Sequence, residues 1–286
     1  MLAEKTENEA DSLVDIVKEV WLFRGLLYQL TLRDIRIRYK QTVMGFAWAL
    51  FMPALIVLSG MIVRLAMARL SGTPLETEAL AGIAAKALPW AFFVGAINTA
   101  NSSLIGNQNL VTKVYFPREV LPLASVLAQT FDTLVGTAAL VLVLPFLGAP
   151  FSLALLWVPF LAAVLFLLTL AAGLFLSAAN LFFRDVKYIV QVVLTFGIFF
   201  TPVFFEPAMF GSLGARLMML NPVAPILEGI RLAVVEAHSL HLTIEVSGVL
   251  VWSPWYLAYS VIWACAGYLL AARMFHGLQY LFAEYA

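Results

Sequence analysis

The chain has 286 residues, of which 63% are hydrophobic and 12% are charged, and its formal net charge is zero. Soluble domains carry about 25% charged and about 45–50% apolar residues, so this composition excludes an ordinary soluble enzyme and indicates an integral membrane protein. The balanced charge gives no reason to expect a nucleic-acid partner. The length suits one bundle of spanning helices, and the single cysteine, Cys265, excludes an internal disulfide and a cluster of cysteines around a metal.

The chain begins with a polar, acidic stretch over residues 1–11, which is predicted to be a disordered tail. It does not have the charged and then apolar pattern of a secretory signal peptide. Ser12 and Asp15 then form a capping-box pattern at the start of a predicted helix. The segment 12–41 is predicted to be an amphipathic helix and a basic linker. It holds too many charges to cross a bilayer, so we expect it to lie along the cytoplasmic membrane interface; a soluble helix packed on a partner is the alternative.

Residues 42–286 are predicted to form one all-α membrane domain with six spanning helices. Crossing ~30 Å of hydrocarbon takes ~20 helical residues. The segments that meet this length are residues 43–63, 87–107, 120–146, 153–179, 188–205 and 253–272. Most of the 17 lysines and arginines then fall on the side of the N-terminus, so the positive-inside rule places both termini in the cytoplasm. Arg64, Lys86 and Arg231 are among the cations left outside.

Polar and aromatic side chains within the spans are candidates for a transport route. Asn98 belongs to a polar end of the second span, which either lines a route for polar cargo or bonds helices together. Aromatic side chains of the first and fifth spans are predicted to line an inner surface on which sugar faces pack, with lipid-facing packing as the alternative. These aromatic residues are Phe46, Trp48, Phe51, Phe196, Phe199 and Phe200.

Asp132 is the one carboxylate well inside a predicted span. A charge at this depth is costly and marks either a pathway or a pair. Its neighbours Gln129 and Thr130, a residue on another helix, or a second copy of the chain would satisfy it. Contact with transported cargo is the alternative, so the role of Asp132 stays open at this point.

The connection between the second and third spans reads NQNLVTKVYFPREVLP. Tyr115 and Phe116 are flanked by charge, and aromatic anchors with a polar rim carry most of the binding energy of an interface. We therefore predict an exposed docking knob, with an interfacial turn anchored by aromatic side chains as the alternative. The other residues assigned to this segment are Asn107, Lys113, Pro117, Arg118 and Glu119.

Prolines break the apolar stretch that separates the fifth and sixth spans. The pieces 208–220 and 223–236 are too short to cross a bilayer. We predict two short helices that dip into the outer leaflet and return, which requires a neighbouring cavity or protein surface. One extracellular loop with an interfacial helix is the alternative.

Motifs for catalysis are missing from the sequence. It contains no G-x-x-x-x-G-K-[ST], no H-E-x-x-H and no G-x-S-x-G. The chain is therefore predicted to be no enzyme and to hold no cofactor. His238 and His241 are interpreted as surface histidines, so no metal site is predicted.

Five stretches carry a resemblance to a known family. In chain order they are LRDIRIRYKQTVMGFAWALFMP, VTKVYFPREVLPLASVL, NLFFRDVKY, FFTPVFF and LNPVAPILEGIR. Together they resemble the transmembrane subunits of ABC-2 type exporters, in particular the branch that exports O-antigen, capsular polysaccharide and teichoic acid. The likeness covers nearly the whole chain from about residue 30, although the acidic tail and the first outside loop, 64–86, are longer than is typical of that family.

The resemblance implies a homodimer in the bacterial inner membrane, joined to two copies of a cytoplasmic ABC ATPase that bind ATP and Mg. The dimer would enclose a channel for an undecaprenyl-diphosphate-linked polysaccharide. The family's coupling helix corresponds to Asn107–Arg118, and its outer gate corresponds to residues 207–236, with Pro207, Asn221, Pro222 and Glu228 as candidate gate residues. An ABC-2 exporter of a drug or small lipid is the nearest alternative; a membrane scaffold and a membrane-embedded glycosyltransferase are more distant ones.

A basic patch precedes the first span. It consists of Arg33, Arg36, Arg38 and Lys40, with Tyr39 between the last two. The resemblance implies that the patch lies near a lateral opening at the depth of the substrate diphosphate, which guanidinium groups suit. Two other interpretations stay open. The patch agrees with the positive-inside rule and with binding of anionic lipid, and it is also suited to contact with the ATPase.

Overall fold

The structure is a computed structural model that describes residues 13–40, 47–72, 77–246 and 248–285. The predicted tail, the Ser12 cap and Phe46 lie outside these ranges. The described chain is helical except for its loops and one antiparallel pair of strands, β1 (Ile244–Val246) and β2 (Val249–Trp252). The prediction of an all-α protein is therefore correct apart from this small hairpin.

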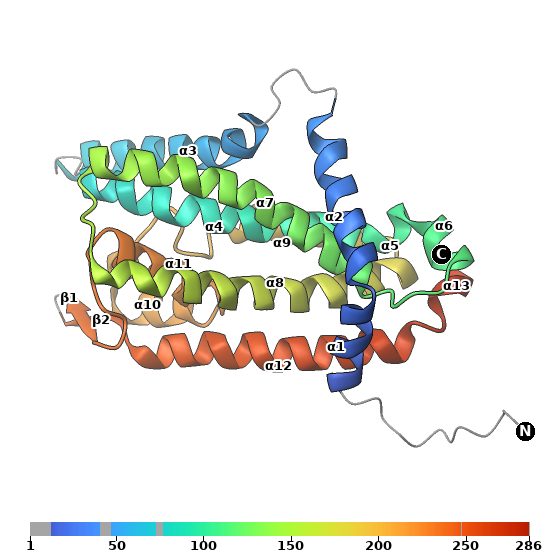
Figure 1. The fold of residues 1–286 in the computed structure, drawn as a ribbon. Coiled ribbons are helices and arrows are strands. Elements are labelled where there is room, and N and C mark those ends of the chain that lie inside the picture. Colours follow the sequence, from blue (N-terminus) through green and yellow to red (C-terminus); the bar gives the residue numbers. More distant parts are fainter. Residues whose placement is uncertain (1–12, 41–46, 73–76, 247, 286) are drawn as a thin grey trace, which may run out of the picture.

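Five of the described helices are long and apolar enough to cross a membrane. They are α3 (Ala47–Ser71), α4 (Thr77–Asn101), α7 (Val120–Val143), α8 (Trp157–Phe182) and α12 (Pro254–Leu278). Figure 1 shows their axes running in roughly the same direction. Helix α8 packs against α4, α7 and α12 and so forms the centre of the bundle. The short 3₁₀ helices Leu144–Leu147 and Leu153–Leu156 connect α7 to α8.

The two ends of the bundle differ (Figure 1). One carries α5 (Ser103–Gly106), α6 (Gln108–Lys113) and α13 (Phe282–Tyr285), and we call it the α6 end. The other carries the 3₁₀ helix Pro207–Phe210, α10 (Gly211–Met219), α11 (Val223–Val234) and the β hairpin, and we call it the α11 end.

The predicted long outside loop over residues 64–86 is wrong. Helix α3 continues to Ser71 and α4 begins at Thr77, so most of this segment is helical. The residues that open α4, TEALAGIAAKAL, are rich in strong helix formers. One lysine, Lys86, breaks the apolar pattern without breaking the helix, and this displaced the predicted start of the span.

The predicted span over 188–205 is only partly helical. Helix α9 (Val186–Gly197) has 12 residues, or ~18 Å at 1.5 Å per residue, and turns follow it because Pro202 lacks a backbone N–H. The chain nevertheless changes ends here. Helix α8 finishes at the α6 end, where Asn180 Nδ2 donates to the carbonyl oxygen of Asn101 over 2.8 Å. Helix α12 begins at the α11 end, directly after β2 (Figure 1).

Two helices occupy the predicted interface segment. They are α1 (Leu13–Leu22) and α2 (Arg24–Tyr39), and a turn at Phe23 separates them. Both run across the bundle axes near the α6 end (Figure 1); α1 contacts α12 and α2 contacts α7. This crosswise direction is the one expected of helices that lie along a membrane interface.

Candidate functional site

The segment predicted to dock on a partner lies at the α6 end. The Tyr115 side chain is 86% exposed, whereas Phe116 is 4% exposed and packs into the core. The predicted pair of exposed aromatic residues is therefore wrong for Phe116. The backbone leaves the helix at Val114, which has an extended conformation. In the irregular segment that follows, the Tyr115 side chain faces outward and the Phe116 side chain faces inward.

Other residues of this segment hold it in place. Arg118 donates through one terminal nitrogen to the carbonyl oxygen of Gln279 over 2.9 Å and through the other to that of Val111 over 3.3 Å. Glu119 Oε1 lies 3.1 Å from His276 Nδ1. Burial raises the pKa of the Glu119 carboxyl, and hydrogen bonding only partly offsets this. Arg118 and Glu119 therefore fasten the segment to the end of α12.

The remaining candidate residues of this segment are also either structural or exposed. Asn107 Nδ2 donates to the carbonyl oxygen of Ser103 over 2.8 Å, and Pro117 is buried. Lys113 is exposed next to Tyr115. Sequence reasoning missed Gln279 and His276, because no local pattern shows that the end of α12 meets the start of α7.

Asp132 connects two helices. Its carboxylate accepts hydrogen bonds from Arg38 and from the Tyr39 hydroxyl, and Gln129 Oε1 accepts from Arg38 over 2.8 Å. Burial raises the pKa of the Tyr39 phenol, and the bond to Asp132 raises it further. The partner of Asp132 is thus on another helix, α2, which was one of the open alternatives. These contacts fasten α2 to α7.

The other cations of the basic patch form fewer contacts with the rest of the chain. Arg33 forms an ion pair with its neighbour Asp34 at 2.9 Å. Arg36 and Lys40 are exposed, and within the described part of the chain no ion pair to either is found. These two residues are therefore the most exposed members of the patch.

The residues predicted to line a channel lie on the surface of the single chain. Trp48 and Phe51 pack edge to face with ring centroids 5.3 Å apart, and both are exposed. Asn98 on α4 is exposed as well. The aromatic residues of the α9 region, which are also exposed, are Phe196, Phe199 and Phe200. All these side chains are accessible to a second copy, to lipid or to cargo.

Two short helices follow α9, as predicted. The predicted pieces 208–220 and 223–236 correspond to α10 and α11. Asn221 forms the turn between them: its Oδ1 accepts from the Val223 amide over 3.1 Å, and its Nδ2 donates to Thr201 Oγ1 over 3.0 Å. The turn is also fixed to α12, because Ser260 Oγ donates to the carbonyl oxygen of Pro222 over 2.8 Å. Pro207 is buried at the start of its 3₁₀ helix.

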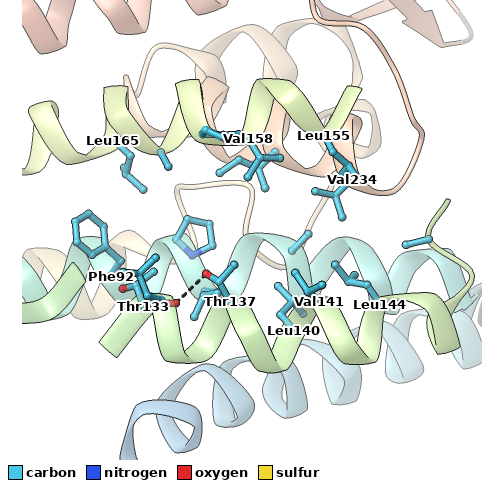
Figure 2. Close-up of a pocket in the computed structure, with 18 of the residues that line it drawn as sticks. Phe92, Thr133, Thr137, Leu140, Val141, Leu144, Leu155, Val158, Leu165 and Val234 are labelled. Atoms are coloured by element: carbon cyan, nitrogen blue, oxygen red, sulfur yellow. Dashed lines mark hydrogen bonds between the residues drawn. The ribbon is translucent and has the colours of Figure 1, made fainter. Parts of the chain in front are cut away.

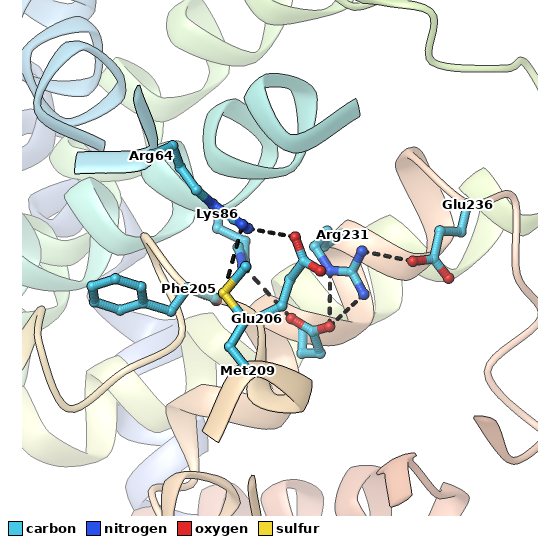
Figure 3. Close-up of polar contacts among 8 residues, drawn as sticks. Arg64, Lys86, Phe205, Glu206, Met209, Arg231 and Glu236 are labelled. Atoms are coloured by element: carbon cyan, nitrogen blue, oxygen red, sulfur yellow. Dashed lines mark hydrogen bonds and ion pairs between the residues drawn. The ribbon is translucent and has the colours of Figure 1, made fainter. Parts of the chain in front are cut away.

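A buried charge cluster joins α11 to α4 (Figure 3). Glu228 and Lys86 are 0% and 1% exposed. Arg231 contacts Glu228 Oε1 at 2.6 Å, and Lys86 Nζ lies 3.7 Å from Glu228 Oε2. Lys86 also donates to the carbonyl oxygen of Phe205 over 2.9 Å. The candidate gate residue Glu228 is therefore the centre of an ionic network.

Further pairs extend this network toward the surface. Arg231 contacts Glu236 at 2.7 Å, and Arg64 of α3 contacts Glu206 at 2.5 Å. We use "charge cluster" for Arg64, Lys86, Glu206, Glu228, Arg231 and Glu236. Its three cations balance its three carboxylates. The sequence assigned the cations of the cluster to the outer side of the membrane. A lone lysine in an apolar run was the available signal, since such residues usually have a partner.

This arrangement, a bundle of long apolar helices with a short helical hairpin at one end, agrees with the sequence comparison. The sequence pattern of the ABC-2 type transporter family matches residues 25–235, so the chain belongs to this family. The matched region runs from α2 to the end of α11. It contains Asp132, Glu228 and residues 107–119, which we call the docking segment after their predicted role. Family membership makes the chain a multi-pass inner-membrane transporter subunit and implies an ABC ATPase as its partner.

Individual relatives narrow the comparison. The chain is similar to the O-antigen export system permease protein RfbA of Myxococcus xanthus, with 30% identity over 252 residues that cover 84% of this chain and 94% of the relative. It is also similar to a protein of the same name from Klebsiella pneumoniae, with 25% identity over 203 residues that cover 71% of this chain and 77% of the relative.

Proposed function

We propose that the chain is the permease subunit of an ATP-driven exporter. Its cargo is an undecaprenyl-diphosphate-linked polysaccharide, which moves from the cytoplasm to the outer side of the inner membrane. The observation that carries this proposal is the similarity to an O-antigen export permease over 94% of that relative's length. Exposed aromatic side chains on α3 and near α9 support it, because sugar faces pack on aromatic rings.

In this proposal the α6 end is cytoplasmic and the chain crosses the membrane six times. The fifth crossing is made by α9 together with the turns that follow it, because the chain leaves α8 at one end and enters α12 at the other (Figure 1). Helices α10 and α11 then form a re-entrant hairpin at the outer face. Both are shorter than the ~20 residues of a span, and the buried contacts of α11 satisfy the condition that a re-entrant backbone is covered by protein.

The working complex is a homodimer with two ATPase subunits, which bind ATP and Mg, while this chain binds neither. Tyr115 and Lys113 contact the ATPase. Movement of that contact is transmitted to α7 and α12, since Arg118 and Glu119 tie the docking segment to the end of α12. Rigid ties are required here because a flexible segment would absorb the displacement.

Replacing Tyr115 by aspartate is expected to abolish assembly with the ATPase. A buried aromatic anchor of an interface contributes ~2 kcal/mol or more, so affinity falls by at least about 30-fold. Co-purification of the ATPase from membranes measures the loss. Tyr280→Asp is the matched control, because Tyr280 is 69% exposed near the same end. Undiminished ATPase recovery with Tyr115→Asp would remove Tyr115 from the interface. Phe116→Asp is unsuitable for this test since Phe116 is buried.

Neutralising Arg36 and Lys40 together, as Arg36→Gln and Lys40→Gln, is expected to reduce export without affecting folding. Each exposed cation contributes ~1 kcal/mol toward an anionic group at the membrane surface, or about fivefold in affinity per residue. Export of polymer to the cell surface, normalised to the amount of permease, measures the effect. The control exchanges the cations as Arg36→Lys and Lys40→Arg and retains export. Full export by the neutral variant would contradict a role for these residues at the diphosphate.

A further inference from the structure

An apolar slot lies between α7 and α8 toward the α11 end (Figure 2). Its volume is about 540 Å³. Figure 2 shows Thr133, Thr137 and Val141 of α7 directed toward Val158 and Leu165 of α8 across the space. Phe92 of α4 and Val234 of α11 contribute to the remaining walls. The slot is separate from the docking segment, from Asp132 and from the charge cluster.

The walls of the slot offer nothing to a polar ligand. No charged side chain is among the residues that line it in the described chain. Its threonine hydroxyls are already engaged, since Thr133 and Thr137 donate to the carbonyl oxygens of Gln129 and Thr133 over 3.0 and 2.8 Å. Apolar cavities of this kind exclude water. A ligand of the slot must therefore be a hydrocarbon.

The slot is long and narrow. Its lining runs along one stripe of α7 from Thr130 and ends at Leu144, the first residue of the following 3₁₀ helix. This stripe corresponds to ~21 Å of helix axis. One leaflet contributes about half of the ~30 Å hydrocarbon core, so the slot is long enough to take a lipid tail. A further helix, ~10–12 Å wide with its side chains, is too thick for this volume.

The mouth of the slot faces the surroundings of the bundle. Leu134, Val141 and Phe151 line the slot and are exposed on the surface of the chain. Because α7 and α8 are long and apolar enough to span a membrane, we expect lipid to contact that surface. A ligand of the slot therefore enters from the bilayer. Its binding is favourable because a filled slot gains van der Waals contacts that an empty slot lacks.

We propose that the slot binds one acyl chain of a bilayer phospholipid, inserted from the leaflet at the α11 end. The chain reaches Ile230 and Val234 of α11, which lie on either side of Arg231 in the sequence. A bound lipid thus packs directly against the helix that carries the charge cluster. This inference does not depend on the nature of the exported cargo.

Photocrosslinking of the full chain tests the proposal. The protein is reconstituted in vesicles of phosphatidylethanolamine and phosphatidylglycerol with a small amount of a phospholipid that carries a diazirine on one acyl chain. After illumination, adducts are expected on Ile230 and Val234. These residues are only 7% and 6% exposed, so lipids on the outer surface of the bundle do not reach them. Adducts confined to exposed positions would overturn the proposal.

Filling the slot distinguishes a bound chain from chance contact. Thr137→Phe places a ring in the slot and is expected to lower the adduct yield on Ile230 and Val234 about tenfold, because the ring displaces roughly two methylene groups. Leu142→Phe is the matched control, since Leu142 is 71% exposed on α7 and does not line the slot. Equal yields in the two variants would overturn the proposal.

The experiment also includes an internal standard and a second variant that fills the slot. Adducts on Ile262, which is exposed on α12, serve as the internal standard for labelling from bulk lipid. If Thr137→Phe does not fold, Thr133→Phe fills the same slot one helical turn away and is expected to give the same loss.

Discussion

Glu228→Gln is expected to lower the free energy of unfolding by ~3–5 kcal/mol, the cost of breaking a buried ion pair by removing one partner. Glu228 is fully buried and contacts both Arg231 and Lys86. The neutral amide leaves the Lys86 ammonium without a carboxylate in direct contact, whereas Arg231 retains Glu236. Thermal unfolding of the purified protein in detergent, followed by circular dichroism, measures the loss.

Two further variants make this prediction specific. Glu245→Gln is the matched control: Glu245 is exposed at the same end of the bundle, and surface charges contribute only ~0–1 kcal/mol. The double variant Lys86→Met, Glu228→Gln is expected to recover part of the stability, because it removes the unpaired charge together with its former partner. Wild-type stability of Glu228→Gln alone, or additive losses in the double variant, would show that the cluster does not hold α11 to α4.

Asp132→Asn is expected to loosen α2 from α7. The substitution keeps the shape of the side chain but removes the charge that accepts hydrogen bonds from Arg38 and Tyr39. Hydrogen bonds to a charged group contribute ~1.5–3 kcal/mol each, so local opening of α2 becomes much more frequent. Hydrogen exchange of the α2 amides, read by mass spectrometry, is expected to accelerate by at least about tenfold.

Two further variants distinguish local loosening of α2 from a general loss of stability. Thr133→Ala, one position along α7, removes a hydroxyl that bonds within its own helix and should leave exchange in α2 unchanged. Arg38→Gln should reproduce the effect of Asp132→Asn, and the two together should add little. Unchanged exchange in α2 after Asp132→Asn would mean that this contact does not position the helix, and with it Arg36 and Lys40.

Local patterns determined much of the fold. Five spanning helices follow from long apolar runs, because length and hydropathy alone decide whether a helix crosses hydrocarbon. The short helices α10 and α11 were predicted from the prolines around them, which cannot continue a helix. The lack of a P-loop motif and the motifs of the ABC-2 family are likewise readable along the chain.

Tertiary structure alone decided which side chains meet. Asp132 lies 94 positions from Arg38 in the chain, and Arg118 lies 161 positions from Gln279. The sequence marked Asp132 as needing a partner but had no means of choosing one. The sequence placed Lys86 outside the membrane because a hydropathy scale gives a paired lysine and a solvated lysine the same value. It predicted an exposed Phe116 because burial depends on packing, which a local pattern does not show. Helical periodicity is a property of neighbours, whereas a partner across the bundle is fixed only when the helices pack.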